Sequence, residues 1–307
     1  MSAAALRNAA PAVADGPPEE TCYALAGHSG ARVVLHAAAA RSVVRKTAAS
    51  PAHNERLLGQ IDKQRHLARI GIPFPKVLAS GIDDGGCAFF DMAYVPGRTL
   101  AFAAANSIPF ASGAVFRAVE RMLWLFQACR GAPIGAGAFH DKIGAIANTA
   151  REYALGDGGL ADAIGDCAER LLALNWEDIP DSPSHGDLTL ENIMLDADRN
   201  VVFIDCDCPF VSSYWLDMGK LFQDLSGHWC LRRLYLSQDR AVQRANAIEK
   251  LTQLESLFRP LVEREDPGLA ERLHQLAALS LFRALPYTGE RAVASFICAR
   301  VRRILER

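Results

Sequence analysis

Short apolar runs separated by turn residues dominate the first hundred positions of the chain. Four such runs lie at 33–35, 43–44, 77–78 and 88–94. Runs of this length that are rich in β-branched and aromatic residues predict β-strands. Between the second and third runs, apolar positions recur at helical spacing over 50–69, and a proline stands in the first turn. The pattern therefore predicts several strands and one helix before residue 95.

Beyond residue 95 the hydrophobic spacing becomes mainly helical. Val95-Pro96-Gly97 interrupts the strand pattern, and one apolar pair at 192–195 and 201–205 is typical of a hairpin. The predicted helices cover 112–129, 160–174, 212–229, 237–263, 268–285 and 289–305. The fold class is therefore α+β. We expect a disordered tail over 1–19, a small unit over 20–95 and a larger, helical unit over 96–307.

Composition excludes several classes of protein. A formal net charge of −2 gives no electrostatic basis for binding nucleic acid or an anionic membrane surface. No apolar run approaches the roughly 18 residues of a membrane-spanning helix. The eight cysteines lack metal-site spacing, so we expect reduced thiols and a cytoplasmic protein. Nothing in the composition indicates a protein partner.

The segment 185–205 carries the most chemical information. A hairpin centred between Asp198 and Arg199 would place Asn192 opposite Asp205, with Asp187 in the loop before it. One carboxylate and one amide oxygen would then meet at the open end of the hairpin. A few oxygen ligands with room for water and phosphate suit Mg²⁺ better than zinc.

These residues resemble a protein-kinase catalytic loop. His185, Asp187 and Asn192 have its spacing, and Asp205 follows where the metal-binding aspartate stands. Gly186 in place of arginine, and Asp-Cys-Asp at 205–207 in place of Asp-Phe-Gly, resemble the aminoglycoside phosphotransferase and choline kinase family. The resemblance implies a bilobal kinase-like fold, in which a small antiparallel-sheet lobe with one helix precedes a larger helical lobe.

The resemblance also implies roles for individual residues. Asp187 would be the catalytic base that orients and deprotonates the acceptor hydroxyl, and Asn192 and Asp205 would hold Mg²⁺. ATP, or GTP, would be the phosphate donor. His185 is expected to hold the loop by hydrogen bonds, and Asp217 to brace the catalytic loop or cap a helix.

The first unit would then bind the nucleotide. Lys46 resembles the strand lysine that contacts the α- and β-phosphates, whereas Arg45 points to the opposite face of its strand. The phosphate-covering loop is expected at 27–31, just before the strand run at 33–35, and adenine is expected at backbone groups near the lobe junction. The residues assigned to these two sites are Gly27, Ser29 and Gly30 for the loop, and Ala93 and Val95 for adenine.

The first helix departs from the family pattern. The family pairs the lysine with a helix glutamate, and the matching position here is Gln60. Gln60 can hydrogen-bond Lys46 but cannot neutralise its charge. Gln64, one turn later, and Glu55, more than one turn earlier, stay open as alternative partners.

The sequence thus predicts a small-molecule kinase that phosphorylates a hydroxyl of an amino sugar, sugar or amino alcohol. Two alternatives stay open. A protein kinase would need a longer activation segment than the eleven residues between Asp205 and Asp217. A nucleotide-binding pseudokinase with a regulatory role is favoured only by Gln60.

The nature of the acceptor is open at this stage. Acidic residues crowd the expected site and hint at a cationic acceptor, whereas arginines of the later helices form either a solvated face or a site for an anionic sugar. Asp207 could also approach a second metal. The residues on which these alternatives depend are Asp187, Glu191, Asp205 and Asp207, and Arg232, Arg233, Arg240 and Arg244.

Overall fold

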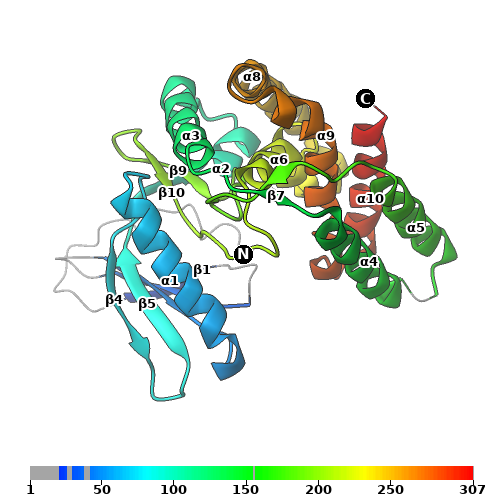
Figure 1. Ribbon diagram of the computed structural model, residues 1–307. Helices are drawn as coiled ribbons and strands as arrows, with labels where there is room; N and C mark the ends of the chain where they lie inside the picture. The colour runs from blue at the N-terminus through cyan, green and yellow to red at the C-terminus, as the bar shows by residue number, and fades with distance from the viewer. Residues whose placement is uncertain (1–20, 26–29, 38–41, 155, 307) are drawn as a thin grey trace. The chain divides into compact units, whose positions relative to one another are not determined.

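The computed structural model describes residues 21–25, 30–37, 42–154 and 156–306 (Figure 1). The tail expected over 1–19, and Gly27 and Ser29 of the expected phosphate loop, lie outside these residues. The chain forms two compact units. The first contains residues up to 100 together with 192–208, and the second contains 101–191 and 209–307. The sequence-based division had instead placed the hairpin at 192–205 with the second unit.

An antiparallel sheet of five strands forms the main layer of the first unit. Its strands are β1 (Thr21–Leu25), β2 (Arg32–Ala37), β3 (Val43–Thr47), β4 (Val77–Ile82) and β5 (Ala88–Ala93). Their order in the sheet is β1-β2-β3-β5-β4, and every neighbouring pair is antiparallel. All four apolar runs of the first hundred residues are therefore strands, as predicted.

The predicted helix is α1 (Asn54–Arg69), which follows a 3-10 turn at Pro51–His53 and packs against β5 and β4 (Figure 1). Leu57 and Ile61 face the sheet and join Ala48, Ala88 and Phe90 in one buried cluster. The apolar face of the helix thus covers strands that would otherwise expose these side chains.

A second, three-stranded sheet completes the first unit. It has the order β10-β9-β6, from β6 (Gly97–Thr99), β9 (Ile193–Asp196) and β10 (Val201–Phe203). The sequence predicted the hairpin but not β6. Gly97 is required there because a Cβ atom would lie 2.2 Å from the carbonyl oxygen of Leu195. The glycine that interrupts the sequence pattern therefore permits a close strand pairing.

The predicted register of this hairpin is wrong by one residue. Val202 pairs with Met194, and the amide of Ile204 donates to the carbonyl oxygen of Asn192 at 2.9 Å. Asn192 therefore lies opposite Ile204 and not opposite Asp205.

The connecting turn explains this shift. The carbonyl oxygen of Asp196 accepts a hydrogen bond from Arg199, and its carboxylate accepts one from the amide of Asn200 at 2.7 Å. Arg199 adopts a left-handed conformation, with φ of 64°. These contacts make a three-residue loop, whereas a loop of even length would have given the predicted register.

Helices dominate the second unit. They are α2 (Leu100–Ala105), α3 (Ser112–Gln127), α4 (Ala136–Tyr153), α5 (Gly158–Leu172), α6 (Tyr214–Leu225), α7 (Arg232–Tyr235), α8 (Ala241–Glu265), α9 (Pro267–Phe282) and α10 (Arg291–Leu305), the first of them starting at the unit boundary. A short strand pair joins β7 (Pro133–Ile134) to β8 (Ile179–Pro180). None of the described helices is long and apolar enough to span a membrane.

Helix α6 forms the centre of the second unit and packs most extensively against α9 (Figure 1). Asp266 caps α9 by accepting from the amide of Leu269 at 3.1 Å, and it also accepts from Tyr214 and Trp215 of α6. The break predicted between the helices at 237–263 and 268–285 is therefore confirmed. The sequence did not predict α4, whose two glycines weaken the helical pattern.

Candidate active site

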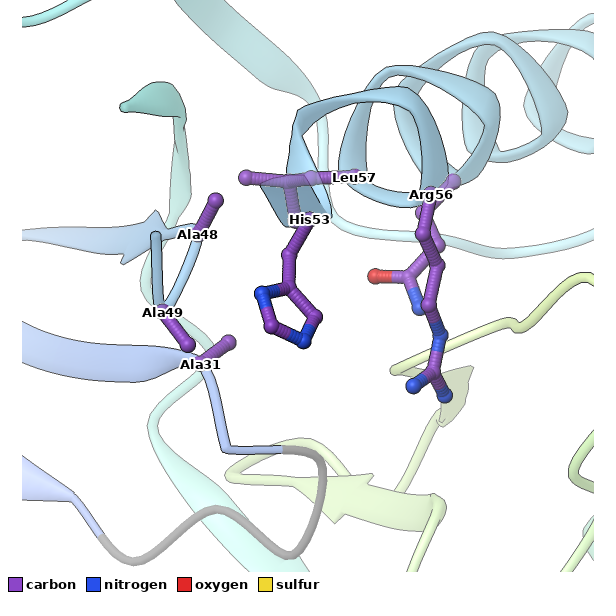
Figure 2. A pocket seen from close by; sticks show the side chains of 7 residues that line it. Ala31, Ala48, Ala49, His53, Arg56 and Leu57 are labelled. Atoms are coloured by element: carbon purple, nitrogen blue, oxygen red, sulfur yellow. The ribbon is translucent and has the colours of Figure 1, made fainter. Parts of the chain in front are cut away.

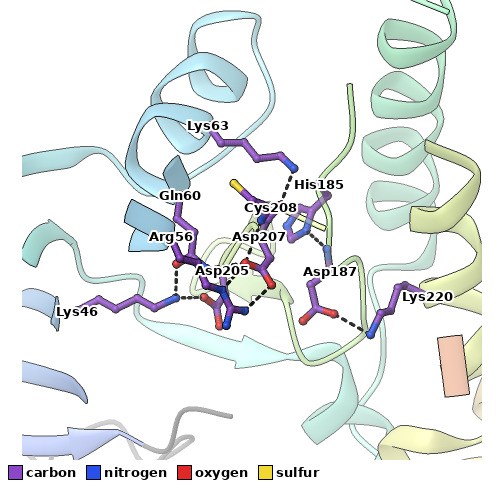
Figure 3. Close-up of polar contacts among 10 residues, drawn as sticks. All are labelled: Lys46, Arg56, Gln60, Lys63, His185, Asp187, Asp205, Asp207, Cys208 and Lys220. Carbon is purple, nitrogen blue, oxygen red and sulfur yellow. Dashed lines mark hydrogen bonds and ion pairs between the residues drawn. The ribbon is translucent and has the colours of Figure 1, made fainter. Parts of the chain in front are cut away.

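Lys46 is the centre of a polar group in the first unit (Figure 3). It lies on β3, and only 3% of its surface is exposed. Its ammonium donates to the side-chain oxygen of Gln60 at 2.9 Å and forms an ion pair with Asp205. A buried ammonium requires such partners because its desolvation is costly.

Arg45 points away from this group, as the strand alternation predicts. Its guanidinium donates two hydrogen bonds to Asp91, at 2.7 and 2.8 Å, and lies 4.3 Å from the ring centre of Phe89. Lys46 and Arg45 therefore have separate partners on the two faces of the sheet.

Gln60 connects Lys46 to a second carboxylate. Its amide nitrogen donates to Asp207 at 2.8 Å, and Arg56 donates two hydrogen bonds to the same carboxylate, at 3.1 and 2.6 Å. Burial acts to raise the pKa of Asp207, but the hydrogen bonds from Arg56 and Gln60 outweigh it and hold the pKa below its usual value. Asp207 is thus an ionised partner of α1.

The expected contact between Gln60 and Lys46 is therefore present. Of the two alternative partners, Gln64 instead donates to the carbonyl oxygen of Pro75 at 2.8 Å. Lys63 adds a further link, from its ammonium to the carbonyl oxygen of Asp207 at 2.6 Å. Helix α1 thereby fastens the segment that follows Asp205.

Asp205 has a backbone conformation that is rare for its residue type. Its φ is 59°, in the left-handed region that favours glycine. Its side chain keeps 41% exposure despite the ion pair with Lys46. A non-glycine residue in this region is held by its surroundings and is often found at functional sites.

Asp205 and Asn192 offer donors that fit a magnesium ion. Both residues lie at the open end of the β9–β10 hairpin in the first unit. A carboxylate and an amide supply hard oxygen donors, and Mg²⁺ in phosphate-transferring sites uses few protein ligands beside phosphate and water. Asp207 is less suited to this task because Arg56 and Gln60 occupy both of its oxygens.

A pocket lies beside this group, at the start of α1 (Figure 2). The ring of His53 points into it, and Arg56 and Gln60 belong to both the pocket and the polar group around Lys46. Its lining residues are Ala31, Ala48, Ala49, His53, Arg56, Leu57 and Gln60. Gly30, which begins the described part of the expected phosphate loop, has a φ of 75° and lies next to Ala49.

The expected adenine site is defined by backbone groups alone. Ala93 ends β5, and Val95 lies between β5 and β6. The amide of Ala93 already donates to the carbonyl oxygen of Lys76 at 2.9 Å. The role expected of Ala93 is thereby limited to its carbonyl oxygen.

In the second unit, Asp217 holds the predicted catalytic loop. This carboxylate on α6 is buried and accepts hydrogen bonds from the amides of His185 and Gly186, at 2.5 and 2.7 Å. Gly186 has a φ of 90°, which explains a glycine at this position. The expected bracing role of Asp217 is confirmed.

Asp187 faces a lysine that the sequence did not reveal (Figure 3). Lys220, one turn after Asp217 on α6, places its ammonium 3.1 Å from the carboxylate of Asp187, which is 36% exposed. Burial acts to raise the pKa of Asp187, but the charge and hydrogen bond of Lys220 outweigh it and hold the pKa below its usual value. Asp187 is therefore ionised at neutral pH.

A further carboxylate supports the end of the same loop. Asp224 is fully buried on α6 and accepts from the amides of Leu190 and Cys230, at 2.7 and 3.0 Å. Burial and the charge of Glu191 raise its pKa to about 7. Glu191 itself pairs with Arg232 at 3.2 Å. Only its position on the helix that carries Asp217 could have indicated Asp224.

The comparisons agree with this arrangement. The sequence model of the phosphotransferase enzyme family matches residues 23–254. Among curated protein sequences, none matches the chain significantly.

Two solved structures illustrate the likeness in fold. The chain is similar to a thermostable mutant of aminoglycoside phosphotransferase APH(4)-Ia in complex with ADP and hygromycin B, with a TM-score of 0.59 and 18% identity over 93% of each chain. It is also similar to the choline kinase LicA from Streptococcus pneumoniae, with a TM-score of 0.56 and 14% identity over 94% of each chain. At these identities the likeness establishes the fold, and the predicted kinase-like α+β fold is confirmed.

Proposed function

Because the chain belongs to the phosphotransferase enzyme family, we propose that it transfers the γ-phosphate of ATP to a hydroxyl group of a small molecule. The observation that carries this proposal is the buried contact of Lys46 with Asp205 and Gln60. The ion pair of Lys46 with Asp205 joins two residues of the expected nucleotide-binding pattern that lie 159 positions apart in the chain. An aminoglycoside phosphotransferase of similar fold binds ADP and hygromycin B, which supports a nucleotide and a small hydroxylated acceptor.

In the first unit, Lys46 binds the α- and β-phosphates, and Asp205 and Asn192 hold Mg²⁺. The bound ion supplies charge neutralisation at the transferred phosphoryl group. Bound Mg-ATP would give Lys46 phosphate partners and Asp205 a metal partner in place of their mutual ion pair. Gln60 keeps the ammonium in place during this exchange, because its oxygen accepts from Lys46 and its amide is bound by Asp207.

In the second unit, Asp187 orients the acceptor hydroxyl and takes its proton. Lys220 keeps this carboxylate ionised, and Asp217 fixes the loop that carries it. Phosphoryl transfer demands mainly positioning and charge stabilisation, which these contacts provide. We place the reaction in the cytoplasm, because all eight cysteines are unpaired thiols.

The pseudokinase alternative is less well supported. It is favoured only by the absence of a glutamate partner for Lys46. The link through Gln60 to Asp207 weakens that argument, because it supplies a negative charge near the lysine. A protein kinase is disfavoured by the eleven residues between Asp205 and Asp217. ATP and GTP are both compatible with backbone recognition of the base.

The test is ADP formation from ATP and Mg²⁺ by the purified full chain with a panel of small hydroxyl compounds. We expect acceptor-dependent turnover that disappears in Asp187→Asn and on removal of Mg²⁺. Calorimetry on the same preparation measures nucleotide affinity with and without Mg²⁺. Tight binding of Mg-ATP without turnover for any acceptor would favour the pseudokinase, and equal affinity without the metal would contradict the site at Asn192 and Asp205.

A further inference from the structure

The acidic residues that hint at a cationic acceptor all have cationic partners within their own units. The pairs are Lys46 with Asp205, Arg56 with Asp207, Lys220 with Asp187, and Arg232 with Glu191. An acidic group that is already paired offers little net attraction to a second cation. The crowding of carboxylates in the sequence is therefore no longer an argument for an amino sugar or amino alcohol.

Most of the arginines considered in the sequence serve the fold as well. Arg232 pairs with Glu191 and lies 4.2 Å from the ring centre of Trp229. Arg233 pairs with Glu290 at 2.9 Å, and Arg244 donates to the carbonyl oxygen of Leu234. Each of these three side chains already has a partner in its own unit, so none of them is favoured as an acceptor site.

Two other cations of the second unit converge on one aromatic ring. The ammonium of Lys142 on α4 lies 5.8 Å from the ring centre of Phe210, and the guanidinium of Arg283, just after α9, lies 5.1 Å from it. Phe210 is held edge-on against Phe139 at 5.7 Å. The ring is therefore fixed, with a positive group at each of two positions around it.

Lys142 has an excess of positive charge around it. Within the described residues it forms no ion pair with a carboxylate, and its ammonium lies over the ring of Phe210. Burial and the charge of Arg283 lower its pKa. A half-buried lysine whose strongest charged neighbour is another cation is an unfavourable arrangement unless an anion joins it.

This cationic group lies within electrostatic range of the catalytic carboxylate. Besides Lys220 and His185, the charge of Arg283 contributes to lowering the pKa of Asp187. Lys220 lies 3.1 Å from Asp187, and the charge of Arg283 acts on both Asp187 and Lys142.

We propose that the acceptor carries an anionic group, a carboxylate or a phosphate, which binds to Lys142 and Arg283 beside Phe210 while its hydroxyl meets Asp187. This inference rests on the proposed phosphotransferase function. A guanidinium and an ammonium are both suited to pairing with a carboxylate or a phosphate, and the contacts with Phe210 hold the two cations near the same ring. A cationic acceptor would be repelled by the same two groups.

The first experiment compares acceptors that share one carbon skeleton and differ in charge. Glucose, glucosamine, glucuronate and glucose 6-phosphate form one set, and the corresponding mannose and galactose compounds form two more. ADP formation at saturating Mg-ATP gives kcat/KM for each compound. We expect an acidic or phosphorylated member to exceed its neutral and amino counterparts by at least about tenfold, the value of one charged contact. The carboxylate and phosphate arms distinguish the two anions.

The second experiment uses Lys142→Met with Lys250→Met as a matched control. Lys250 on α8 is also half-buried, and its ammonium lies 5.5 Å from the ring centre of Phe110. We expect Lys142→Met to raise KM for the anionic acceptor by about tenfold and to leave KM for ATP unchanged. Lys250→Met should change neither value. Lys142→Glu should shift the preference toward the amino counterpart.

The outcomes separate this inference from the proposed function. Preference for a neutral or amino acceptor, with no effect of Lys142→Met, would overturn the inference and leave the phosphotransferase intact. If the enzyme binds Mg-ATP, calorimetry on its complex with a non-hydrolysable ATP analogue tests the acidic compounds directly, and binding of none of them would also overturn the inference. Failure to bind Mg-ATP at all would instead overturn the proposed function.

Discussion

The side-chain amide of Gln60 donates a hydrogen bond to the carboxylate of Asp207 at 2.8 Å. This contact fixes the orientation of the amide, so that its oxygen points to Lys46 and accepts from it at 2.9 Å. A helix glutamate would place its negative charge directly beside the lysine. Here the carboxylate of Asp207 carries a negative charge one hydrogen bond farther away, beyond Gln60. Arg56 balances that charge on its other side.

Gln60→Glu should therefore weaken the enzyme, although it restores the residue type that the family uses. The new carboxylate would lie against Asp207, and two like charges at hydrogen-bond distance repel each other. We expect KM for ATP to rise about tenfold, equivalent to about 1.4 kcal/mol. Steady-state kinetics with ATP as the varied substrate measures the change.

The double variant Gln60→Glu with Asp207→Asn is the control for this prediction. It removes one of the two facing charges, and KM for ATP should return to within about threefold of the wild-type value. If Gln60→Glu alone improves ATP binding, Asp207 does not govern the orientation of Gln60.

Lys46→Ala should be far more harmful than Arg45→Ala. Lys46 is buried beside Asp205, whereas Arg45 pairs with Asp91 on the opposite face of β3. We expect kcat/KM for ATP to fall by at least about a hundredfold in Lys46→Ala, as for a lost charged phosphate contact, and by no more than about threefold in Arg45→Ala. The reverse order of effects would contradict the assignment of Lys46 to the phosphates.

Asp187→Asn should abolish most turnover while nucleotide binding is retained. The amide keeps the size of the side chain but cannot accept the proton of the hydroxyl, and general-base contributions are about 10²–10⁴ in rate. Asp205→Asn should lower both turnover and the affinity for Mg-ATP. Phosphoryl transfer and calorimetric affinity are measured for both variants, and near-normal turnover in a folded Asp187→Asn would rule out its role as base.

Lys220→Met should change the pH dependence of the reaction. The ammonium of Lys220, 3.1 Å away, lowers the pKa of Asp187, whereas burial raises it. Once the ammonium is removed, the effect of burial is less compensated, and the pKa of Asp187 should rise. The acidic limb of the kcat/KM profile should then move upward by about one pH unit. Lys220→Arg keeps the charge and should leave the limb in place. An unchanged profile in Lys220→Met would mean that the pair does not set the ionisation of Asp187.

Asp224 should make the fold less stable as the pH rises. Its pKa is raised from 3.8 to about 7 in the folded chain, so the folded state binds more protons than the unfolded state in this interval. The stabilisation is full below about pH 4 and is lost as the pH rises through about 7. Three pKa units correspond to about 4 kcal/mol, as an upper bound.

Denaturant unfolding of wild type and Asp224→Asn between pH 4 and 8 measures this effect. The asparagine does not titrate, so the difference in the free energy of unfolding between the two proteins should vary with pH in the interval of Asp224. Parallel curves over the whole range would show that Asp224 keeps an ordinary pKa.

The sequence predicted those parts of the fold that depend on local pattern. Strands β2 to β5 of the first sheet and α1 follow from the apolar runs and the helical spacing, and Lys46 and Arg45 fall on the faces that alternation assigns. The three residues of β6 are too few to form a pattern. The hairpin register depends on the left-handed conformation of Arg199. Arginine rarely adopts this conformation, so the sequence gives no reason to expect it there.

The predicted site shows the same division. Spacing within one segment predicts Asp187, Asn192 and Asp205 as site residues, but helical spacing left three candidates for the partner of Lys46. Contacts between elements that are distant in the sequence could not be predicted, because a single sequence does not show which of their side chains meet. They include Lys220 beside Asp187, and Lys142 and Arg283 around Phe210.

The β9–β10 hairpin makes the first unit discontinuous in the chain, because residues 192–208 complete a body that otherwise ends at residue 100. A fragment ending there would lack β9, the strand that pairs with β6, and would bury Lys46 without Asp205. The first unit is therefore not a module that truncation can excise or gene fusion can transplant. To isolate it, an engineer would have to splice the hairpin onto Leu100 through a designed linker.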